Sequence, residues 1–394
     1  MNTFKFIGQI KMLENKKDRK FIETVDFDSG WTIERVKFRM ICGDSSEFVD
    51  LSGGKFKDDA KNTVYTLFRK SATGTNKEVE KAQVAWKDRF NADIIEKVPG
   101  YKRYTIDLSS DKIRKALEEK IGKEKDGEVR AKLEEELSNA LKAKYSYIAQ
   151  YDFVLKVEEL LKSGAFNNGN FVVSGTVEYN YSIKDNDEGR YYRSFVPTNI
   201  YRASDDEVQS ATGKVDLYYI KDDVILDACE NGDVPVSGYL QFYEKMSQEN
   251  YFVPATVYLR ANNEKKEGLQ NVINIDKDKG DVQYLGINVE YFDGSPKEEL
   301  TLENLDDDSK QLIAWGIRTF EEIKAECGGS YGDNISKVYF TDLARTWKTP
   351  MEADVEVERL LAKPDGKKKE KNKGVKKETK KFDLFAEDDD DDEI

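Results

Sequence analysis

The segment TFKFIGQIKML (residues 3–13) decides the fold, because apolar and polar side chains alternate along it. Alternation with a period of two is typical of a strand with one buried face. Further strands of this kind are predicted at FIETVDF (21–27), WTIERVKFRMIC (31–42), SEFVDLSGGKF (46–56) and NTVYTLFR (62–69). Short strands separated by Gly, Asp and Asn turns predict a first domain, a small all-β barrel or sandwich, for residues 1–110.

The period changes after residue 110. DKIRKALEEK (111–120) and EVRAKLEEELSNALKAK (128–144) place apolar residues three and four apart among Glu and Lys, which predicts exposed amphipathic helices. Residues 111–165 are therefore expected to form a helical insertion or connector.

A second β-rich block follows, with predicted strands at NFVVSGTVEYNYSI (170–183), RYYRSFVPTNIYRA (190–203), GKVDLYYI (213–220), PVSGYLQFYEK (235–245) and NYFVPATVYLRA (250–261). Residues 166–364 are expected to form a second β-rich domain with an α+β elaboration. Whether 271–345 is a separate module is left open by the sequence. The fold class is α+β and mainly β.

An internal similarity favours a duplicated module. Phe4-x-x-x-Gly8-x-Ile10 aligns with Phe171-x-x-x-Gly175-x-Val177, and a turn and a basic-aromatic strand follow in both copies. A glycine inside a first strand is typical of a barrel strand that bends sharply. We therefore expect tandem barrels.

Composition excludes several classes of site. The chain has 394 residues, no histidine and three widely spaced cysteines, so a disulfide framework, a structural zinc site and imidazole catalysis have no residues to build them. No P-loop pattern is present, and DKDKGD (276–281) departs from the calcium-loop pattern. We expect no enzyme activity and no cofactor. With no long apolar run and no signal-peptide pattern, we expect a cytoplasmic protein.

Charge is distributed unevenly along the chain. Residues 1–110 carry 21 basic and 17 acidic side chains, a net charge of +4, whereas residues 163–364 carry 21 and 37, a net charge of −16. Residues 365–381 are basic (+6) and residues 382–394 hold eight acids and no base. A partner with a phosphate backbone is therefore expected to bind the first domain, although the whole chain has a net charge of −14.

The strand at 31–42 carries the main candidate site. Alternation predicts a core face made of Thr32, Glu34, Val36, Phe38 and Met40. The opposite face is then made of Trp31, Ile33, Arg35, Lys37 and Arg39. One large aromatic side chain with three cations is suited to stack a base and to follow phosphates. An ordinary solvated strand face would show the same pattern.

Cations and tyrosines of other predicted strands complete the expected site. These are Lys5, Lys11, Tyr65, Arg69, Arg190, Tyr191, Tyr192, Arg193, Tyr201 and Arg202.

The C-terminal segment 365–394 is low in complexity and is predicted to be disordered, as a basic linker followed by an acidic tail. The tail, FDLFAEDDDDDEI (382–394), mixes acids with a few large apolar residues. Such a segment competes with phosphates for a cationic groove and docks its apolar residues on partners. A purely solubilising tail has a similar composition.

Taken together, the sequence resembles single-stranded DNA-binding proteins of the OB-fold class, and those of large bacteriophages most. The Phe-x-x-x-Gly strands, the basic-aromatic strands that follow them and the acidic C-terminus carry the resemblance. It implies a protein that coats and protects single-stranded DNA in replication, recombination or repair, and that recruits partners through its tail. The corresponding tail residues are Phe382, Asp383, Leu384, Phe385, Asp388, Asp389, Asp390, Asp391, Asp392, Glu393 and Ile394.

The sequence departs from that family in two respects. Bacterial relatives end in Pro-Phe, whereas the aromatic residues Phe382 and Phe385 precede the acids here. The chain is also more than twice as long as the common bacterial form, which suggests a monomer with tandem folds. The competing hypothesis is an acidic-tailed protein-interaction or assembly factor that binds no nucleic acid.

Overall fold

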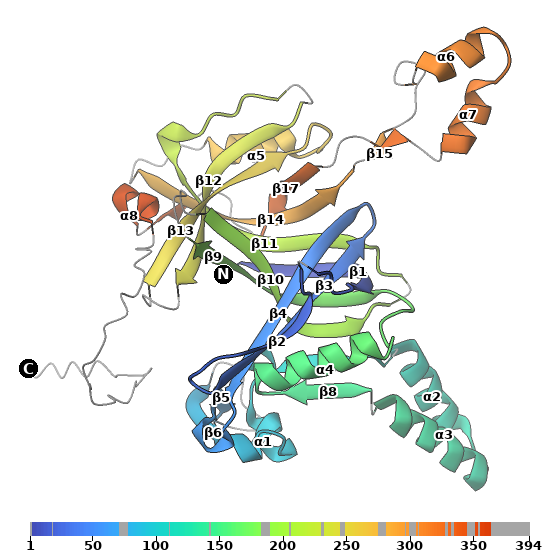
Figure 1. Ribbon diagram of the computed structural model, residues 1–394, viewed down its shortest axis with the longest axis vertical. Helices are drawn as coiled ribbons and strands as arrows, with labels where there is room; N and C mark the ends of the chain where they lie inside the picture. Colours follow the sequence, from blue (N-terminus) through green and yellow to red (C-terminus); the bar gives the residue numbers. More distant parts are fainter. Residues whose placement is uncertain are drawn as a thin grey trace, which may run out of the picture.

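The computed structural model describes most of the chain and shows a mainly β protein with several helices (Figure 1). The described residues are 2–17, 19–70, 78–109, 111–141, 143–182, 190–204, 206–229, 232–244, 249–274, 281–295, 297–298, 305, 307–327, 330–331, 335–344, 351–353 and 355–363. Within helices and strands, the side chains of 111–116, 136, 138–141, 182, 190, 244, 297–298, 324–327, 330–331 and 351–352 are not described.

Strands account for the larger part of the secondary structure. In chain order they are β1 (Thr3–Met12), β2 (Ile22–Asp26), β3 (Trp31–Cys42), β4 (Ser45–Phe56), β5 (Thr63–Arg69), β6 (Val79–Ala85), β7 (Tyr104–Asp107), β8 (Lys144–Tyr147), β9 (Phe171–Ser182), β10 (Arg190–Arg202), β11 (Ser210–Ile220), β12 (Val234–Glu244), β13 (Glu249–Leu259), β14 (Val282–Gly294), β15 (Lys297–Glu298), β16 (Ser330–Tyr331), β17 (Ile335–Leu343) and β18 (Met351–Glu352).

The α-helices lie mostly in the connections between strands. They are α1 (Ala92–Lys97), α2 (Asp111–Lys123), α3 (Gly127–Leu141), α4 (Gln150–Lys162), α5 (Lys266–Ile273), α6 (Asp307–Ala314), α7 (Phe320–Cys327) and α8 (Val357–Leu361).

A first ring of paired strands is formed by β1, β3, β4, β10 and β9, and we call it the first barrel. β3 pairs with both β1 and β4, β4 meets β10 in parallel at Val49 and Phe195, and β9 pairs with β10 and returns to β1. β1 changes partners at Gly8, where a Cβ atom would lie 1.9 Å from the carbonyl oxygen of Ile41. Glycine at this position therefore allows β1 to bend, so that it pairs with β9 before the bend and with β3 after it.

The core of the first barrel consists of apolar side chains from alternate strand positions, closed at one end by α4. Phe6, Phe38 and Phe153 are completely buried in it. α4 lies between β4 and β9 in the sequence, and its apolar face joins the same cluster. One core therefore spans residues that are about 150 positions apart.

This arrangement differs from the domain boundaries expected from the sequence. Strands β9 and β10, expected to begin a second domain after residue 165, are needed to close the barrel that begins at residue 3. The similarity between 4–10 and 171–177 also has another origin, because the two segments are antiparallel partners: Phe4 lies opposite Gly175, and Gly8 lies opposite Phe171. Large side chains on one strand thus face glycines on the other.

A second closed ring is formed by β11, β12, β13, β17 and β14, and we call it the second barrel. β12 joins β11 to β13, β13 meets β17 in parallel at Tyr258 and Tyr339, and β14 pairs with β17 and β11. α5 lies between β13 and β14 in the sequence, as α4 lies between β4 and β9. Both rings thus share one strand order and one helix position.

The two barrels are joined by backbone pairing. β1 pairs with β11 over residues 3–7, so the first strand of each barrel lies beside that of the other. Ser45 adds a second link, because its hydroxyl donates to the carbonyl of Tyr291 and accepts from the backbone N–H of Asp293. The barrels therefore belong to one continuous hydrogen-bonded sheet.

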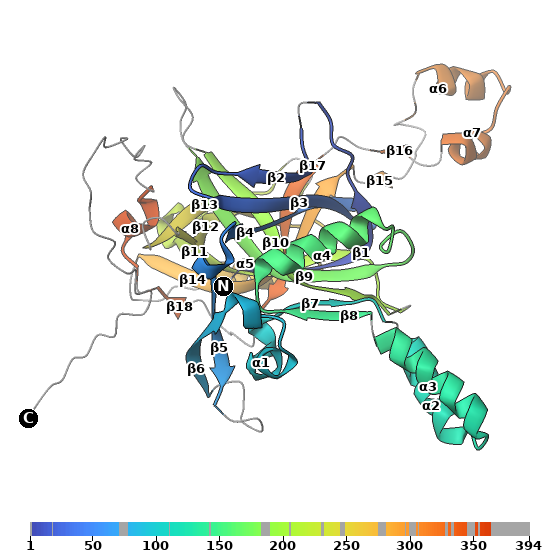
Figure 2. The same ribbon diagram turned by 60° about the horizontal axis from the view of Figure 1, so that its bottom comes forward.

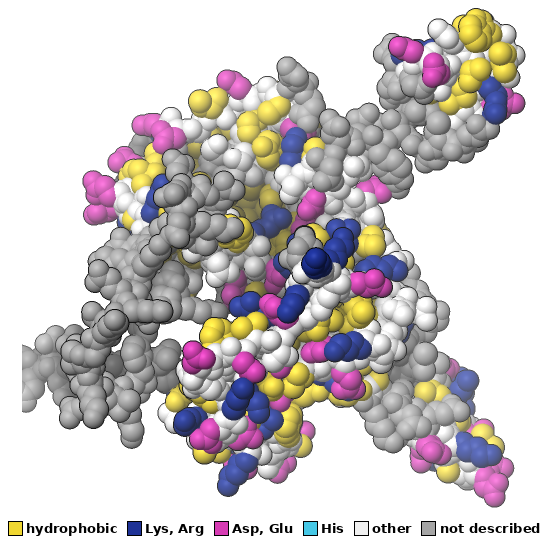
Figure 3. Space-filling view, viewed as in Figure 1, with side chains coloured by type: hydrophobic (Ala, Val, Ile, Leu, Met, Phe, Trp, Pro, Cys, Tyr) yellow, Lys and Arg dark blue, Asp and Glu magenta, His cyan; other side chains and the backbone are white. Residues whose placement is uncertain are grey.

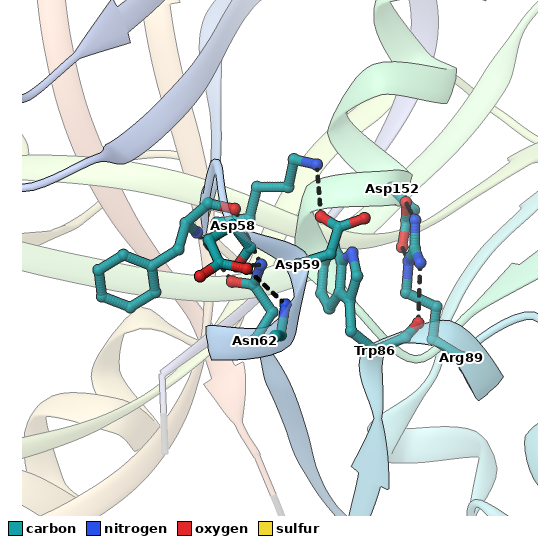
Figure 4. A network of polar contacts seen from close by, with 9 residues as sticks. Asp58, Asp59, Asn62, Trp86, Arg89 and Asp152 are labelled. Carbon is teal, nitrogen blue, oxygen red and sulfur yellow. Dashed lines mark hydrogen bonds and ion pairs between the residues drawn. The ribbon is translucent and has the colours of Figure 1, made fainter.

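The segment between β4 and α4 forms a small unit beside the first barrel. The β5–β6 hairpin and α1 enclose a separate apolar cluster that includes Trp86 and Ile148. Arg89 fixes this unit to α4 through a nearly buried ion pair with Asp152, 2.8 Å from Nε to the carboxylate, and it also donates to the carbonyl of Trp86 (Figure 4). Asn62 closes the turn before β5 by hydrogen bonds to the backbone of Phe56.

Two helical hairpins project from the body, α2–α3 and α6–α7 (Figures 1 and 2). Residues 124–126 separate α2 from α3. The chain turns between α6 and α7, where Gly316 has a φ of +69°. None of the helices within the described residues is long and apolar enough to cross a membrane.

Candidate nucleic-acid interface

The predicted faces of β3 are confirmed by burial. Val36, Phe38 and Met40 are at most 1% exposed and point into the first barrel. Trp31, Ile33, Arg35, Lys37 and Arg39 lie on the outward face and are partly or largely exposed. The expected aromatic and cationic row is therefore presented to solvent.

The neighbouring strand β4 adds two aromatic rings that the sequence did not single out. Phe56 lies opposite Trp31, with the ring centres 4.8 Å apart in an edge-to-face arrangement. The Trp31 indole lies over Gly54, where a Cβ atom would come within 2.4 Å of the ring. Phe48, at the other end of the face, lies opposite Arg39.

Cations gather around the Phe48 ring. The guanidinium carbons of Arg39 and Arg19 lie 4.8 and 5.5 Å from its centre, and the Lys37 ammonium lies 5.6 Å away. Lys11 of β1 is the direct cross-strand partner of Arg39 and is exposed. We call Lys11, Arg19, Lys37, Arg39 and Phe48 the Phe48 cluster.

Arg19 belongs to a basic loop that the sequence analysis treated only as a turn. Asn15 holds this loop, because its side-chain oxygen accepts from the N–H groups of Phe21 and Ile22 and its amide donates to the Ile22 carbonyl. Arg19 also lies over Phe21, at 5.0 Å. Lys and Arg side chains (dark blue) gather near the centre of the face in Figure 3. The run ENKKDRK (14–20) was the available signal for these cations.

Several cations of this surface have no carboxylate partner within the described residues. These are Lys11, Lys16, Lys17, Arg19, Lys20 and Arg39. Arg35 and Lys37 are paired, with Glu23 at 3.2 Å and with Asp50 at 2.7 Å. Both pairs are partly exposed and therefore contribute little to stability, so a phosphate can replace the carboxylate at small cost.

A groove of about 310 Å³ runs across this face. Lys20 and Phe21 border it on the loop side, and its floor is formed by residues of β3, β4, β10 and β9, including Arg35, Lys37 and Ser194. The groove is open, so it suits an extended chain better than an enclosed small molecule.

Three other expected contact residues lie elsewhere. Lys5 is exposed on β1 and pairs with Glu207 at 3.3 Å. Tyr65 is 57% exposed on the β5–β6 hairpin, which is a separate sheet. Arg69, at the end of that hairpin's first strand, donates to the carbonyl of Glu96. The structure does not place these side chains in the groove.

In the basic-aromatic stretch 190–193, the described side chains of Tyr191 and Arg193 point inward and that of Tyr192 points outward. Tyr191 packs against Phe242, and the Arg193 guanidinium lies 3.6 Å from the buried Glu47 carboxylate and 5.1 Å from the centre of the Tyr291 ring. Because alternate residues of β10 point in opposite directions, Tyr192 faces outward and is 45% exposed. The side chain of Arg190 lies outside the described residues.

Burial affects the carboxyl group of Glu47 strongly. Desolvation raises its pKa to about 7, although Arg193 opposes the shift, and the nearby Asp293 adds to it. Arg193 therefore acts at the junction of the barrels, as a partner for a buried acid.

Tyr201 and Arg202 line a second, polar hollow of about 350 Å³ with residues of β7, including Thr105 and Asp107. Arg202 lies over the Phe171 ring at 5.2 Å and donates to the carbonyls of Leu108 and Asn168. Its guanidinium is thus partly used within the protein, whereas Tyr201 is 36% exposed.

The acidic tail residues and the basic linker lie outside the described residues. Within the described part of the chain, no group of three or more Cys, Asp or Glu side chains is placed to hold a metal ion.

Comparison with known proteins gives little further information. No family model matches the sequence, and no curated protein matches it. Among solved structures, the chain is similar to a deletion mutant of the single-stranded DNA-binding protein from Thermus aquaticus, with 8% identity and a TM-score of 0.28, over 74% of this chain and 87% of that one. A TM-score this low does not establish a common arrangement of strands.

Proposed function

We propose that the chain is a single-stranded DNA-binding protein and that the DNA lies across the outward face of β3 and β4. The Phe48 cluster carries this proposal. It combines a ring on which a base can stack with Lys11, Arg19 and Arg39, three cations that have no carboxylate partner within the described residues, in a protein whose net charge is −14. Stacking together with phosphate contacts is the usual basis of sequence-tolerant binding to single strands.

The length of the face is consistent with this ligand. Trp31 and Arg39 are eight residues apart on one strand, which is about 26 Å in an extended backbone. That length is enough for about four nucleotides, the lower end of the range for one OB fold. Aromatic rings at both ends, Trp31 with Phe56 and then Phe48, would hold the outer bases.

The strand order supports an OB assignment for both barrels. In each ring the third strand lies parallel to the fifth, and a helix precedes the fourth strand. A five-stranded Greek-key barrel that binds oligonucleotides on its second and third strands is the OB arrangement. In the first barrel those strands are β3 and β4, which carry Arg39 and Phe48.

The wider role follows from the same proposal. The protein would coat and protect single-stranded DNA in replication, recombination or repair, as a monomer without a cofactor or a catalytic step. Residues 382–394 would recruit partner proteins. Tyr192 and Tyr201 lie outward on β10, where they are available to contact further nucleotides of the DNA strand.

A titration of labelled oligo-dT, followed by fluorescence anisotropy, tests the proposal. The wild type should bind at low salt, and the variant Arg19→Ala/Arg39→Ala/Phe48→Ala should bind at least about 100-fold more weakly. The matched control Phe90→Ala/Lys123→Ala/Arg130→Ala removes one exposed ring and two cations away from the groove and should bind like the wild type. Equal affinity of the two variants would rule out this site. If the wild type does not bind at all, the protein-interaction factor becomes the better hypothesis.

A further inference from the structure

The second barrel carries a cluster of aromatic residues on its outer surface. Tyr218 of β11 lies opposite Tyr239 of β12, and its ring centre lies 5.0 Å from that of Phe252 and 5.5 Å from that of Tyr284. These side chains alternate with core residues such as Leu217 and Tyr219, so they point out of the barrel. On their own they would form an exposed apolar surface.

Residues 351–353 and 355–361 of the same chain cover this surface. β18 pairs with residues 283–284 of β14, and the N–H of Ala353 donates to the carbonyl of Val282 at 3.1 Å. α8 then lies beside β13 (Figures 1 and 2), where Leu360 is completely buried and Phe252 is only 3% exposed. The covering segment thus combines strand addition with a short helix, two established forms of peptide recognition.

The rim of this surface is acidic. Asp216 and Asp223 lie close enough to raise the pKa of the Tyr218 and Tyr239 hydroxyls, although burial has the larger effect on both. Glu249 accepts a hydrogen bond from the Arg359 guanidinium at 2.9 Å, which lowers the pKa of that carboxyl. Such a rim repels phosphates and favours a cationic ligand.

We propose that this face of the second barrel is a docking groove for a basic amphipathic helix of a partner protein, and that α8 occupies it in cis. The anchors of the occupant are Val357 and Leu360, three residues apart on one helical face, and its cation Arg359 meets Glu249. A partner helix with aliphatic residues at this spacing and more positive charge would replace it. The two barrels then have different ligands, and this inference does not depend on DNA binding by the first.

The cis occupant is well suited to exchange. α8 has only five residues, and its ion pair with Glu249 is about half exposed. Glu356 and Glu358 are exposed, so the occupant carries two negative charges beside the single positive charge of Arg359. The occupant therefore has charges of the same sign as the acidic rim, and a helix with more positive charge should bind this surface more tightly.

A peptide-binding experiment with the full-length chain tests this inference. A fluorescein-labelled peptide of residues 351–363 is titrated with the wild type and with Leu360→Asp, which removes the buried anchor. The variant should bind the peptide at least about tenfold more tightly, because the apparent dissociation constant scales inversely with the fraction of open grooves. The matched control Leu361→Asp changes an exposed side chain beside the anchor and should behave like the wild type.

A second peptide tests the charge of the partner. With Glu356→Lys and Glu358→Lys in the peptide, binding to the Leu360→Asp protein should become tighter and more sensitive to salt. The inference is overturned if the folded Leu360→Asp protein binds neither peptide. A basic partner is excluded if the original peptide binds more tightly than the peptide with Glu356→Lys and Glu358→Lys. If Leu360→Asp does not fold, Leu360→Ala replaces it, and failure of that folded variant to bind overturns the inference equally. Oligo-dT binding, measured in parallel, reports separately on the first barrel.

Discussion

The guanidinium of Arg39 lies over the ring of Phe48, and the two residues are direct cross-strand partners on β3 and β4. Arg39 has no carboxylate partner within the described residues, so the guanidinium contacts the Phe48 ring while its positive charge stays unneutralised. A base that stacks on Phe48 would leave this cation free to meet the adjacent phosphate. One pair of side chains thus offers both parts of a nucleotide site.

Single substitutions should separate these two roles. Phe48→Ala should weaken oligo-dT binding by about 1–3 kcal/mol with an unchanged salt dependence, because stacking releases no counterions. Arg39→Ala should reduce the slope of log K against log salt by about 0.7. Titrations at several salt concentrations measure both quantities. A lower slope for Phe48→Ala would assign the ring a structural role instead of a stacking one.

Gly8→Ala should destabilise the first barrel by about 3 kcal/mol or more. The new Cβ would meet the carbonyl oxygen of Ile41 at 1.9 Å, and neither backbone can move without breaking strand pairs. Gly122→Ala is the control, because this helical glycine has open space around it and alanine should stabilise α2 by up to about 1 kcal/mol. Denaturant unfolding compares the two, and similar stabilities would contradict a bend that requires glycine.

Asp152→Ala should lower the stability of the protein by about 3 kcal/mol, because it leaves the largely buried Arg89 guanidinium without its carboxylate. The control is Asp59→Ala, which removes a partly exposed pair with Lys55 and should change stability by less than about 1 kcal/mol. Thermal unfolding gives the comparison. Oligo-dT affinity of the folded Asp152→Ala protein should remain that of the wild type, since the pair lies on the α4 side of the sheet.

Glu47→Gln should stabilise the protein in a pH-dependent way. The folded-state pKa of about 7 lies above the ordinary value of 4.5, so the folded protein binds the proton more tightly than the unfolded chain. The penalty for ionising Glu47 therefore begins above pH 4.5, grows until pH 7 and is constant beyond it, at most about 3 kcal/mol.

The difference in unfolding free energy between Glu47→Gln and the wild type isolates this group from the many surface carboxylates. It should be smallest near pH 4.5 and largest at pH 8. The raised pKa already includes the attraction of Arg193, so the increase of this difference with pH is the decisive observation. A constant difference would mean that Glu47 titrates normally.

Local pattern was sufficient to predict β3 and its two faces. Strict alternation placed Phe38 and Met40 inside the barrel and Lys37 outside it, because the strand has one buried side along its whole length. Phe48 could not be found in this way, since a lone aromatic residue in a strand is usually a core residue. Its role depends on register, which sets it opposite Arg39.

The pairing of β9 with β1, which bears on the expected domain boundary at residue 165, could not be predicted for a related reason. Phe171 and Gly175 have the same spacing as Phe4 and Gly8, and the sequence alone does not distinguish a repeated strand from a complementary one. The pairing of β1 with β9 joins residues about 170 positions apart, and no local signal marks such a contact. Arg190, Tyr191, Tyr192 and Arg193 were all expected at the DNA, and the inward position of Arg193 depends on the closure of the barrel, which no local pattern shows.

The pairing of β1 with β11 has a mechanical consequence. Domains that are joined by a flexible linker can change their relative position, so together they can cover different lengths of a polymeric ligand. Here the first strands of the two barrels are fused edge to edge, from Thr3 opposite Lys214 to Ile7 opposite Ser210. The two barrels should therefore keep a fixed relative position, and the length of ligand that the molecule covers should be constant. Separating the barrels would leave β1 and β11 each with an edge of unpaired backbone N–H and C=O groups.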